Sequence, residues 1–198
     1  MTRILHVIPG LTGGGAELQL TTLATMQARR GHSVHIALLR MEVPAQLTEA
    51  GVVVHQLQAA SSFDPLMFWR LHGIVRTSRA DIVQTWLTLP DVVGGTVALS
   101  HGTPWVLSER SEAAAYPPSW KHSTRVRLAR RCSAIIANSE RGASYWTSQG
   151  LPAGRITVIP NAVTVPLPDQ TGVATIPAEF EDRPLVLFAG RLSSEKNP

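Results

Sequence analysis

The sequence predicts an α/β protein built on a Rossmann-like parallel sheet with helices on both faces. Two observations lead to this prediction. Short apolar segments alternate along the chain with longer segments of helical periodicity, and a glycine-rich loop separates the first apolar segment from the first helical one. Strands that alternate with helices form parallel crossover units, and the connecting helices cover both faces of the sheet.

The first strand and the first helix are predicted from the opening of the chain. Residues 4–8 are mostly apolar, and Pro9 ends this strand because proline has no N–H to donate. Apolar residues from Ala16 to Ala24 follow the spacing of a buried helix face, and Gly31 supplies a C-cap after two arginines.

The remaining elements are predicted from the same kinds of signal. Apolar, often β-branched runs indicate strands, and glycines after helical segments indicate helix ends. Asp64 and Pro65 form a helix start, with an N-cap side chain followed by proline at the first helical position. Further strands are expected at residues 34–39, 52–57, 82–85, 105–108, 134–137 and 156–159. Further helices are expected at residues 44–50, 64–78, 91–99, 119–131 and 139–149.

The composition changes after Asn161. Residues 162–184 are rich in proline and show little periodicity, which is typical of a linker. Residues 185–189 are fully apolar, and a polar loop follows to residue 198. We therefore expect a Rossmann-like domain over residues 1–161, a linker over 162–184, and the first strand and loop of a truncated second domain over 185–198.

The composition favours a soluble cytoplasmic protein. The 198 residues are 44% hydrophobic and 16% charged, as in ordinary globular proteins. The single cysteine, Cys132, excludes an internal disulfide and is compatible with a reducing compartment. The first apolar run is too short for a signal peptide, and no run is long enough to span a membrane.

The positive charge is concentrated in one segment. Five basic residues and no acidic residue lie between positions 119 and 131, namely Lys121, Arg125, Arg127, Arg130 and Arg131. The whole chain carries +4, so the remainder carries −1, which argues against a general nucleic-acid-binding protein. The segment suits either an anionic partner, such as an anionic membrane surface, or a solvated arginine-rich helix.

The loop after the first strand is a candidate phosphate site. It contains three consecutive glycines, Gly13, Gly14 and Gly15. A strand, a glycine turn and a helix start aim backbone N–H groups and the positive end of a helix dipole at an anion. A tight turn without a ligand is the alternative. Ligands of parallel sheets bind beyond the carboxyl ends of the strands, so residues that follow other strands are candidates too.

Four motifs in order resemble the retaining, GT-B-fold glycosyltransferases of family 4. They are the glycine loop, IIANSE at residues 135–140, VIPN at 158–161, and FAGRL followed by EKN at 188–197. The resemblance covers essentially the whole chain, as an acceptor-side domain followed by the first strand and phosphate loop of a donor-nucleotide domain.

The resemblance implies transfer of a hexosyl unit from a UDP- or GDP-sugar to a glycan or lipid-linked acceptor, with retention of anomeric configuration. The donor diphosphate would lie between the glycine loop and a pair of cations, Arg191 and Lys196. These groups would stabilise the departing nucleoside diphosphate, so we expect neither a metal ion nor a cofactor. The acceptor is expected near Trp86, Ser139 and Asn161.

The sequence departs from the family near the reacting groups. Many relatives carry a histidine where Arg110 follows the fifth predicted strand. Because arginine cannot act as a base, Arg110 is expected to orient substrate or stabilise charge. Glu109 is either an acceptor-activating carboxylate or a surface carboxylate. The family's pair of glutamates does not occur within these 198 residues, so we expect the chain alone to be inactive.

Other functions remain open. A dinucleotide-dependent oxidoreductase also has a glycine loop here, but Leu18 stands where its third glycine is required, and no acidic residue ends the second strand. A non-catalytic sugar-nucleotide or partner-binding module would share the motifs, and so would another GT-B enzyme such as a sugar-nucleotide epimerase.

Overall fold

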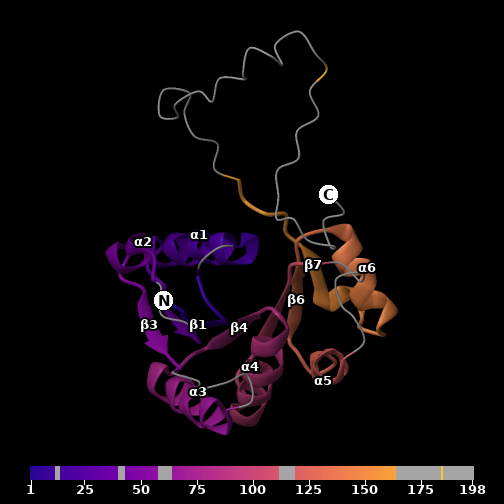
Figure 1. Cartoon of the computed structure of the whole chain (residues 1–198), viewed down its shortest axis with the longest axis horizontal. Helices are drawn as coiled ribbons and strands as arrows, with labels where there is room; N and C mark the ends of the chain where they lie inside the picture. The colour runs from indigo at the N-terminus through magenta and orange to yellow at the C-terminus, as the bar shows by residue number, and fades with distance from the viewer. Residues whose placement is uncertain (12–13, 40–42, 58–63, 112–118, 164–183, 185–198) are drawn as a thin grey trace. The chain divides into compact units, whose positions relative to one another are not determined.

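Seven parallel strands form the centre of the protein in a computed structural model, which describes residues 1–11, 14–39, 43–57, 64–111, 119–163 and 184. The strands are β1 (Arg3–Ile8), β2 (Ser33–Leu38), β3 (Val53–Gln56), β4 (Ile82–Trp86), β5 (Trp105–Glu109), β6 (Ala134–Ala137) and β7 (Ile156–Val158). Their order in the sheet is β3-β2-β1-β4-β5-β6-β7 (Figure 1). This order and the parallel pairing confirm the predicted Rossmann-like fold.

Helices connect successive strands. They are α1 (Gly15–Arg29), α2 (Ala45–Glu49), α3 (Pro65–Ser78), α4 (Thr88–His101), α5 (Trp120–Ala129) and α6 (Glu140–Ser148), and a 3-10 turn, η2 (Ala153–Arg155), precedes β7. The predicted cap is present at α3, where the Asp64 carboxylate accepts from the Leu66 N–H at 2.9 Å. Gly31 and Gly150 adopt φ values of 83° and 86° beyond their helices, as expected of C-terminal glycines.

Two apolar cores cover the two faces of the sheet. On one face, Leu20 and Ala24 of α1 and Leu47 of α2 pack against β1 and β2. On the other face, side chains of α3, α4 and α6 form the larger core, which includes Leu71 and Trp146. Figure 1 shows α1 and α2 on one side of the strands and α3, α4 and α5 on the other.

The start of α4 differs from the prediction. The helix begins at Thr88 rather than at Asp91, and Leu87 before it takes a φ of 73°, which is rare for leucine. Pro90 is tolerated in the first helical turn, where its missing N–H has no helical partner to lose. Asp91 therefore lies inside the helix and is fully buried, rather than starting it.

Two adjacent glycines bring α4 close to the sheet. A Cβ at Gly94 would lie 2.7 Å from the Thr85 methyl group, and a Cβ at Gly95 would lie 2.5 Å from the Trp105 ring. Any larger side chain would therefore push the helix away from β4 and β5. This close approach places the first turn of α4, with Asp91, directly beside the ends of those strands.

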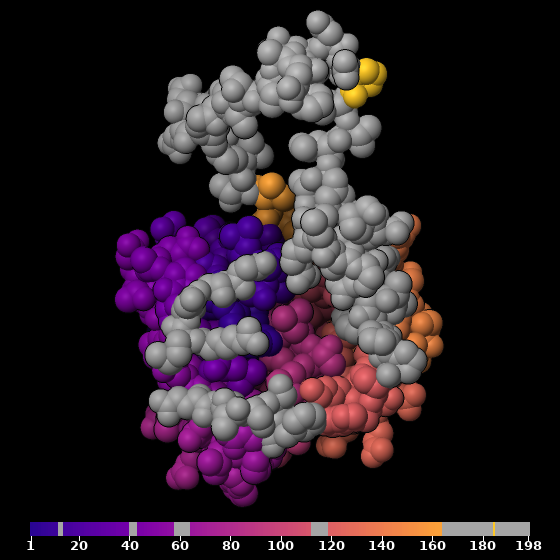
Figure 2. All heavy atoms as spheres, viewed as in Figure 1, coloured from indigo at the N-terminus to yellow at the C-terminus, as the bar shows by residue number. Residues whose placement is uncertain are grey.

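The domain boundaries remain predictions. The described residues from Met1 to Ala162 belong to one compact unit. The expected strand and loop at 185–198, with Arg191 and Lys196, lie outside the described residues, as does most of the expected linker. In the space-filling view, the early segments in indigo and purple lie on the left and the late segments in orange lie on the right, with the middle of the chain between them (Figure 2).

Candidate active site

Arg110 is the centre of a cluster at the carboxyl edge of the sheet. It follows β5 directly, and its guanidinium carbon lies 4.4 Å from the centre of the Trp86 ring, at the end of β4. Its Nη1 donates to Oδ1 of Asn161, which follows β7, at 3.0 Å. Three residues predicted separately as site residues are therefore brought together. A guanidinium over an aromatic ring is held by a cation–π attraction as well as by its hydrogen bond.

The guanidinium has a buried donor that is unused among the residues that the structure describes. Its Nε is buried and has no hydrogen-bond partner there. Burial lowers the pKa of Arg110, while the nearby charge of Glu109 raises it, and a guanidinium remains protonated at neutral pH in either case. A fixed cation with a spare donor is suited to an anionic oxygen of a substrate.

A buried histidine fixes the Trp86 ring beneath Arg110. The indole Nε1–H donates to Nδ1 of His6 at 3.3 Å, and His6 Nε2 lies 2.8 Å from Oε1 of Gln27 on α1. Burial lowers the pKa of His6 to about 4, although the bond to Gln27 opposes this shift. The ring is therefore neutral at pH 7, with Nδ1 accepting and Nε2 donating. Trp86 is fully buried in this arrangement and supports Arg110. Its expected contact with an acceptor stays a prediction.

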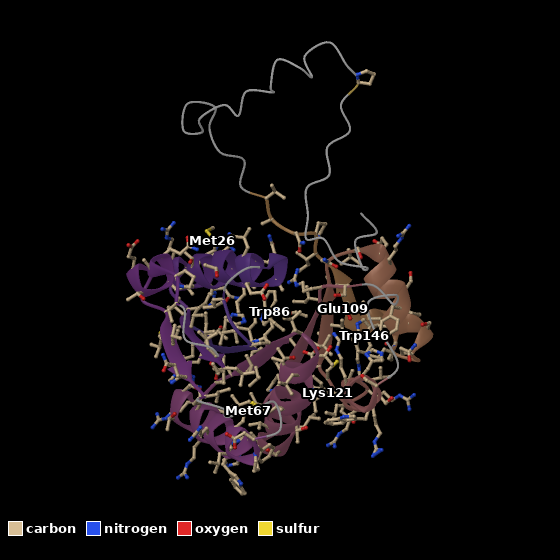
Figure 3. All side chains as sticks on the ribbon, viewed as in Figure 1. Met26, Met67, Trp86, Glu109, Lys121 and Trp146 are labelled. Atoms are coloured by element: carbon tan, nitrogen blue, oxygen red, sulfur yellow. The ribbon has the colours of Figure 1, made fainter. Side chains whose placement is uncertain are left out.

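Glu109 points to the other face of the sheet and into the protein. It is fully buried, and its carboxylate accepts from Arg125 Nη2 at 3.1 Å, from Trp146 Nε1 at 2.8 Å and from the Ser111 N–H at 2.8 Å. Figure 3 shows Glu109 and Trp146 close together beside α6. The carboxylate is not at the surface, which corrects one of the two predicted alternatives. Its bonded and buried position gives no support to the other, activation of an acceptor.

Arg125 joins Glu109 to a second buried carboxylate. Its Nε donates to Oδ2 of Asp91 at 2.6 Å, and all three side chains are fully buried. Thr85 Oγ1 donates to Oδ1 of Asp91. Burial raises the pKa of Asp91 to about 6, even though Arg125 and Thr85 favour its ionised form. We call Asp91, Glu109 and Arg125 the buried ion cluster; it ties α4 and α5 to the end of β5.

The basic residues predicted at positions 121–131 do not share one environment. Arg125 is interior, whereas Arg127, Arg130 and Arg131 are exposed and Lys121 is half-buried. The expectation of five basic residues on one patch is therefore wrong for Arg125. The exposed arginines lie toward the C-terminal end of α5, away from the carboxyl edge of the sheet.

The glycine loop is only partly described. Gly13 lies outside the described residues, Gly14 is the N-cap of α1, and Gly15 is its first residue. A Cβ on Gly15 would meet nothing within 4 Å, while the Glu17 carboxylate lies over Gly14. The N-terminus of α1 therefore has room beside Gly15, and a carboxylate of the chain already lies next to its free N–H groups.

Ser139 has a capping role in this structure. Its Oγ accepts from the Gly142 N–H at 3.2 Å and caps α6. A Cβ on Gly142 would lie 3.3 Å from Glu109 Cγ, so α6 begins tight against the end of β5. The expected contact between Ser139 and an acceptor stays a prediction.

A hollow of about 350 Å³ adjoins Arg110 on the α1 side of the sheet. Gln84, Trp86 and Gln27 line it together with apolar side chains of α1 and β6. At its rim, Gln19 of α1 exchanges two hydrogen bonds with the backbone of Ala162, at 2.6 and 2.8 Å. These bonds fix the segment after β7, and with it Asn161, against α1.

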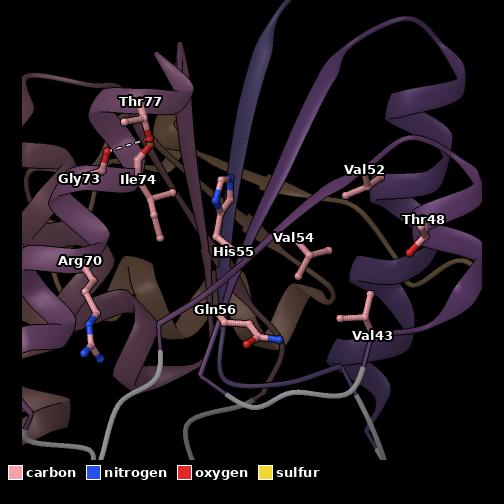
Figure 4. Close-up of a pocket in the computed structure, with 10 residues that line it drawn as sticks. All are labelled: Val43, Thr48, Val52, Val54, His55, Gln56, Arg70, Gly73, Ile74 and Thr77. Carbon is pink, nitrogen blue, oxygen red and sulfur yellow. Dashed lines mark hydrogen bonds between the residues drawn. The ribbon is translucent and has the colours of Figure 1, made fainter.

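A larger hollow of about 820 Å³ lies elsewhere, around the edge strand β3 and between α2 and α3 (Figure 4). It is lined by Val54, His55 and Ile74 among others, and it contains none of the predicted site residues. Its size alone does not make it a site, since the residues with chemistry suited to a phosphate or sugar gather at Arg110.

Sequence reasoning missed His6, Gln27, Asp91, Arg125 and Trp146. His6 interrupts an otherwise apolar strand, and Asp91 interrupts a segment of small apolar residues. A polar residue within an apolar pattern was the signal that could have indicated a buried, hydrogen-bonded side chain at each position. Their partners are distant in sequence, so the pairing could not be predicted from local spacing. Among the described residues there is no cluster of three or more metal-ligand side chains, and no helix there is both long and apolar enough to cross a membrane.

The sequence matches the model of a known protein family. The sequence model of Glycosyltransferase Family 4 matches residues 13–165. The chain is 26% identical over 208 residues to GalNAc-α-(1→4)-GalNAc-α-(1→3)-diNAcBac-PP-undecaprenol α-1,4-N-acetyl-D-galactosaminyltransferase of Campylobacter jejuni, covering 100% of this chain and 55% of that protein.

Solved structures show the same fold. HepE of Anabaena in complex with UDP and glucose superposes with a TM-score of 0.66 at 21% identity, covering 82% of this chain and 45% of that one. UDP-GlcNAc 2-epimerase of Methanocaldococcus jannaschii superposes with a TM-score of 0.57 at 14% identity, covering 80% and 45%. The chain thus spans about half the length of the relatives it matches.

Proposed function

Because the chain belongs to glycosyltransferase family 4, we propose that it is part of an enzyme that transfers a hexosyl unit from a UDP- or GDP-sugar to a glycan or lipid-linked acceptor, with retention of configuration. A nucleotide-sugar donor is supported by structures of HepE with UDP and with UDP-glucose. A lipid-linked acceptor is supported by the undecaprenol-linked substrate in the name of the Campylobacter relative.

The observation that carries the proposal is the position of Arg110. It lies at the carboxyl edge of the sheet, stacked on a fixed tryptophan and bonded to Asn161, with its Nε unpartnered within the described part of the chain. Transfer of a hexosyl unit leaves negative charge on the departing nucleoside diphosphate. A cation already held in place stabilises that charge without the cost of reorganising at the moment of reaction.

The donor diphosphate would bind between two walls. One wall is the glycine loop, where the free N–H groups at the start of α1 point away from the helix. The other is formed by Arg191 and Lys196, which lie outside the described residues. In this proposal Glu17 moves away from the N-terminus of α1 when the diphosphate arrives. Neither a metal ion nor a cofactor is required, because the two cations and the N–H groups neutralise the phosphates.

Acceptor binding is assigned to the same edge of the sheet. Trp86 and Asn161, which both contact Arg110, and Ser139, which follows β6, are the residues assigned to the acceptor. Glu109 is assigned a positioning role, since it anchors the strand end on which Arg110 sits. The reaction would take place at the cytoplasmic face of a membrane if the acceptor is lipid-linked.

The test is a panel of UDP- and GDP-sugars offered to the gene product, including whatever residues its gene encodes beyond Pro198, with undecaprenyl-diphosphate-linked glycans as acceptors. Transfer to an acceptor is expected, and Arg110→Gln should lower kcat/KM by about 10²-fold or more. Arg29→Gln, which removes an exposed charge on α1, is the control and should leave the rate unchanged. Equal rates for the two variants would show that Arg110 has no part in the reaction.

One other enzyme class has structural support, because the fold is shared with a UDP-GlcNAc 2-epimerase. An epimerase would convert a UDP-sugar without any acceptor, whereas a transferase would release free nucleoside diphosphate only with transfer or hydrolysis. Following the UDP-sugar by NMR in the absence of an acceptor separates the two. Binding without any turnover would favour the non-catalytic module.

A further inference from the structure

We infer that the protein contacts an anionic lipid bilayer through a surface formed by Leu66, Trp69, Trp120 and Lys121, which we call the tryptophan face. The inference rests on the proposed function, because a lipid-linked acceptor has to be reached at a membrane. It differs from the expectation based on sequence, which relied on the basic residues up to Arg131.

The tryptophan face holds large apolar side chains that the protein leaves in water. Leu66, Trp69 and Trp120 are 54%, 67% and 58% exposed. Trp69 lies edge-on to Phe68, with ring centres 5.9 Å apart, and Phe68 and Trp120 line the same apolar hollow of about 240 Å³. Phe68 therefore connects the exposed Trp69 ring to the hollow that the exposed Trp120 also lines. Gathered exposed apolar groups of this kind mark an interaction surface.

The surface lies at the edge of the molecule where the candidate active site lies. Leu66 is in the first turn of α3, and Trp120 is the first residue of α5. Helices that follow parallel strands begin at the carboxyl edge of the sheet, where Arg110 is found. Leu89, next to the end of β4, lines the same hollow as Phe68 of α3 and Trp120 of α5. A lipid-linked acceptor held by a bilayer at this surface would thus reach the carboxyl edge of the sheet, which Arg110 borders from the α1 face.

The charge on these helices suits an anionic bilayer rather than a basic partner. Within α3 and α5 there is no acidic residue, while Arg70, Arg76, Lys121 and Arg127 carry positive charge. Lys121 Nζ lies 5.9 Å from the centre of the Trp120 ring. Tryptophan is enriched at the level of lipid head groups, and lysine beside it is attracted to anionic lipids.

Vesicle co-sedimentation of the chain tests the proposal, with phosphatidylcholine vesicles compared with vesicles containing phosphatidylglycerol. We expect binding to the anionic vesicles that weakens with salt. The double variant Trp69→Ala/Trp120→Ala should bind at least about tenfold more weakly, because it removes most of the apolar area that enters the interface. Met26→Ala, which removes an exposed apolar side chain from α1 on the opposite face of the sheet, is the matched control and should bind like the parent chain.

A second measurement needs no variant. Trp86, Trp105 and Trp146 are buried, so brominated lipids can quench only Trp69 and Trp120 among the five tryptophans. We expect quenching and a blue shift of emission upon vesicle binding. The absence of quenching would overturn the proposal even if the protein sediments. A larger loss of binding in Arg130→Gln/Arg131→Gln than in the double tryptophan variant would place the contact at the other end of α5 and overturn it as well.

These measurements are made without donor or acceptor, so their outcome is separate from that of the proposed function. Failure to bind vesicles, together with transfer to a water-soluble acceptor, would leave the transferase assignment standing and remove only the tryptophan face. Binding to vesicles without any transfer would support the tryptophan face and count against the transferase assignment.

Discussion

At the scale of single residues, the buried ion cluster is the most sensitive feature of the protein. Arg125 lies between Asp91 and Glu109, and none of the three side chains is exposed. We predict that Arg125→Met lowers the free energy of unfolding by about 3–5 kcal/mol, because it leaves two buried carboxylates without their cation. Urea denaturation measures this loss.

The control for this substitution lies on the same helix. Arg127 is exposed, so Arg127→Met should change the free energy of unfolding by less than about 0.5 kcal/mol. If Arg125→Met and Arg127→Met were equally mild, the cluster would contribute nothing to stability.

His6 makes stability depend on pH. Its pKa is lowered to about 4 in the folded protein from 6.5, because burial disfavours the charged ring. Between these values the unfolded chain binds more protons than the folded one, so the contribution of His6 is complete above pH 6.5 and is lost as pH falls toward 4. The loss amounts to about 3 kcal/mol. Asp91, with a pKa raised to about 6, contributes with the opposite sign.

The comparison that isolates His6 is therefore between the parent chain and His6→Gln at each pH. We predict that the stability of the parent chain relative to His6→Gln decreases as pH falls from 6.5 to 4, measured by urea denaturation. A constant difference over this range would mean that the ring titrates normally.

At the residue scale, sequence reasoning selected groups next to strand ends that lie together in the structure, and it missed the residues that support them. The proximity of Arg110 and Trp86 could be predicted because topology brings strand ends together, whereas Asn161 was named through the resemblance. The partners His6 and Gln27 could not be predicted, since the hydrogen bond from Trp86 to His6 joins residues 80 positions apart. Glu109 was expected to be either an acceptor-activating or a surface carboxylate, and only the positions of Arg125 and Trp146 show that it faces the interior.

At the scale of elements, the packing of α4 on the sheet depends on glycine. We predict that Gly95→Ala lowers the free energy of unfolding by about 1–3 kcal/mol, since its Cβ would lie 2.5 Å from the buried Trp105 ring. Gly73→Ala in α3 is the matched control, because no atom lies within 4 Å of its added Cβ. It should raise stability by about 0.5–1 kcal/mol through helix propensity. Thermal denaturation of both variants tests this prediction. Stabilisation by Gly95→Ala would show that α4 can move away from the sheet without loss of stability.

Element boundaries were predictable where side chains cap the backbone locally. Asp64 and Ser139 cap their helices, and glycines with positive φ end several of them, so these limits could be predicted from sequence. The start of α4 could not, because it depends on the unusual backbone of Leu87 and on a charge pair between Asp91 and Arg125 that only the folded chain forms.

At the scale of the whole molecule, the structure supplies one wall of a proposed two-walled site. The chain covers about half of the length of its relatives. Arg110 and the N-terminus of α1 are described, whereas Arg191 and Lys196 lie outside the described residues. The fold of the described part could be predicted almost completely from the alternation of strands and helices, since each crossover is a local pattern. The donor wall could be predicted only through resemblance.

We predict that the 198-residue chain by itself folds but transfers no sugar. The sheet and its two cores are formed within residues 1–162, so unfolding by urea should be a single cooperative transition. The resemblance implies that catalysis also requires a pair of glutamates that grips the donor, and these 198 residues do not include it, so the donor is held too weakly to stabilise the transition state. Incubation with radiolabelled UDP- and GDP-sugars and a lipid-linked acceptor should give no labelled product, while the gene product with all residues encoded beyond Pro198 should give it. Transfer by the 198-residue chain at a comparable rate would contradict this prediction and show that these residues are sufficient for the reaction.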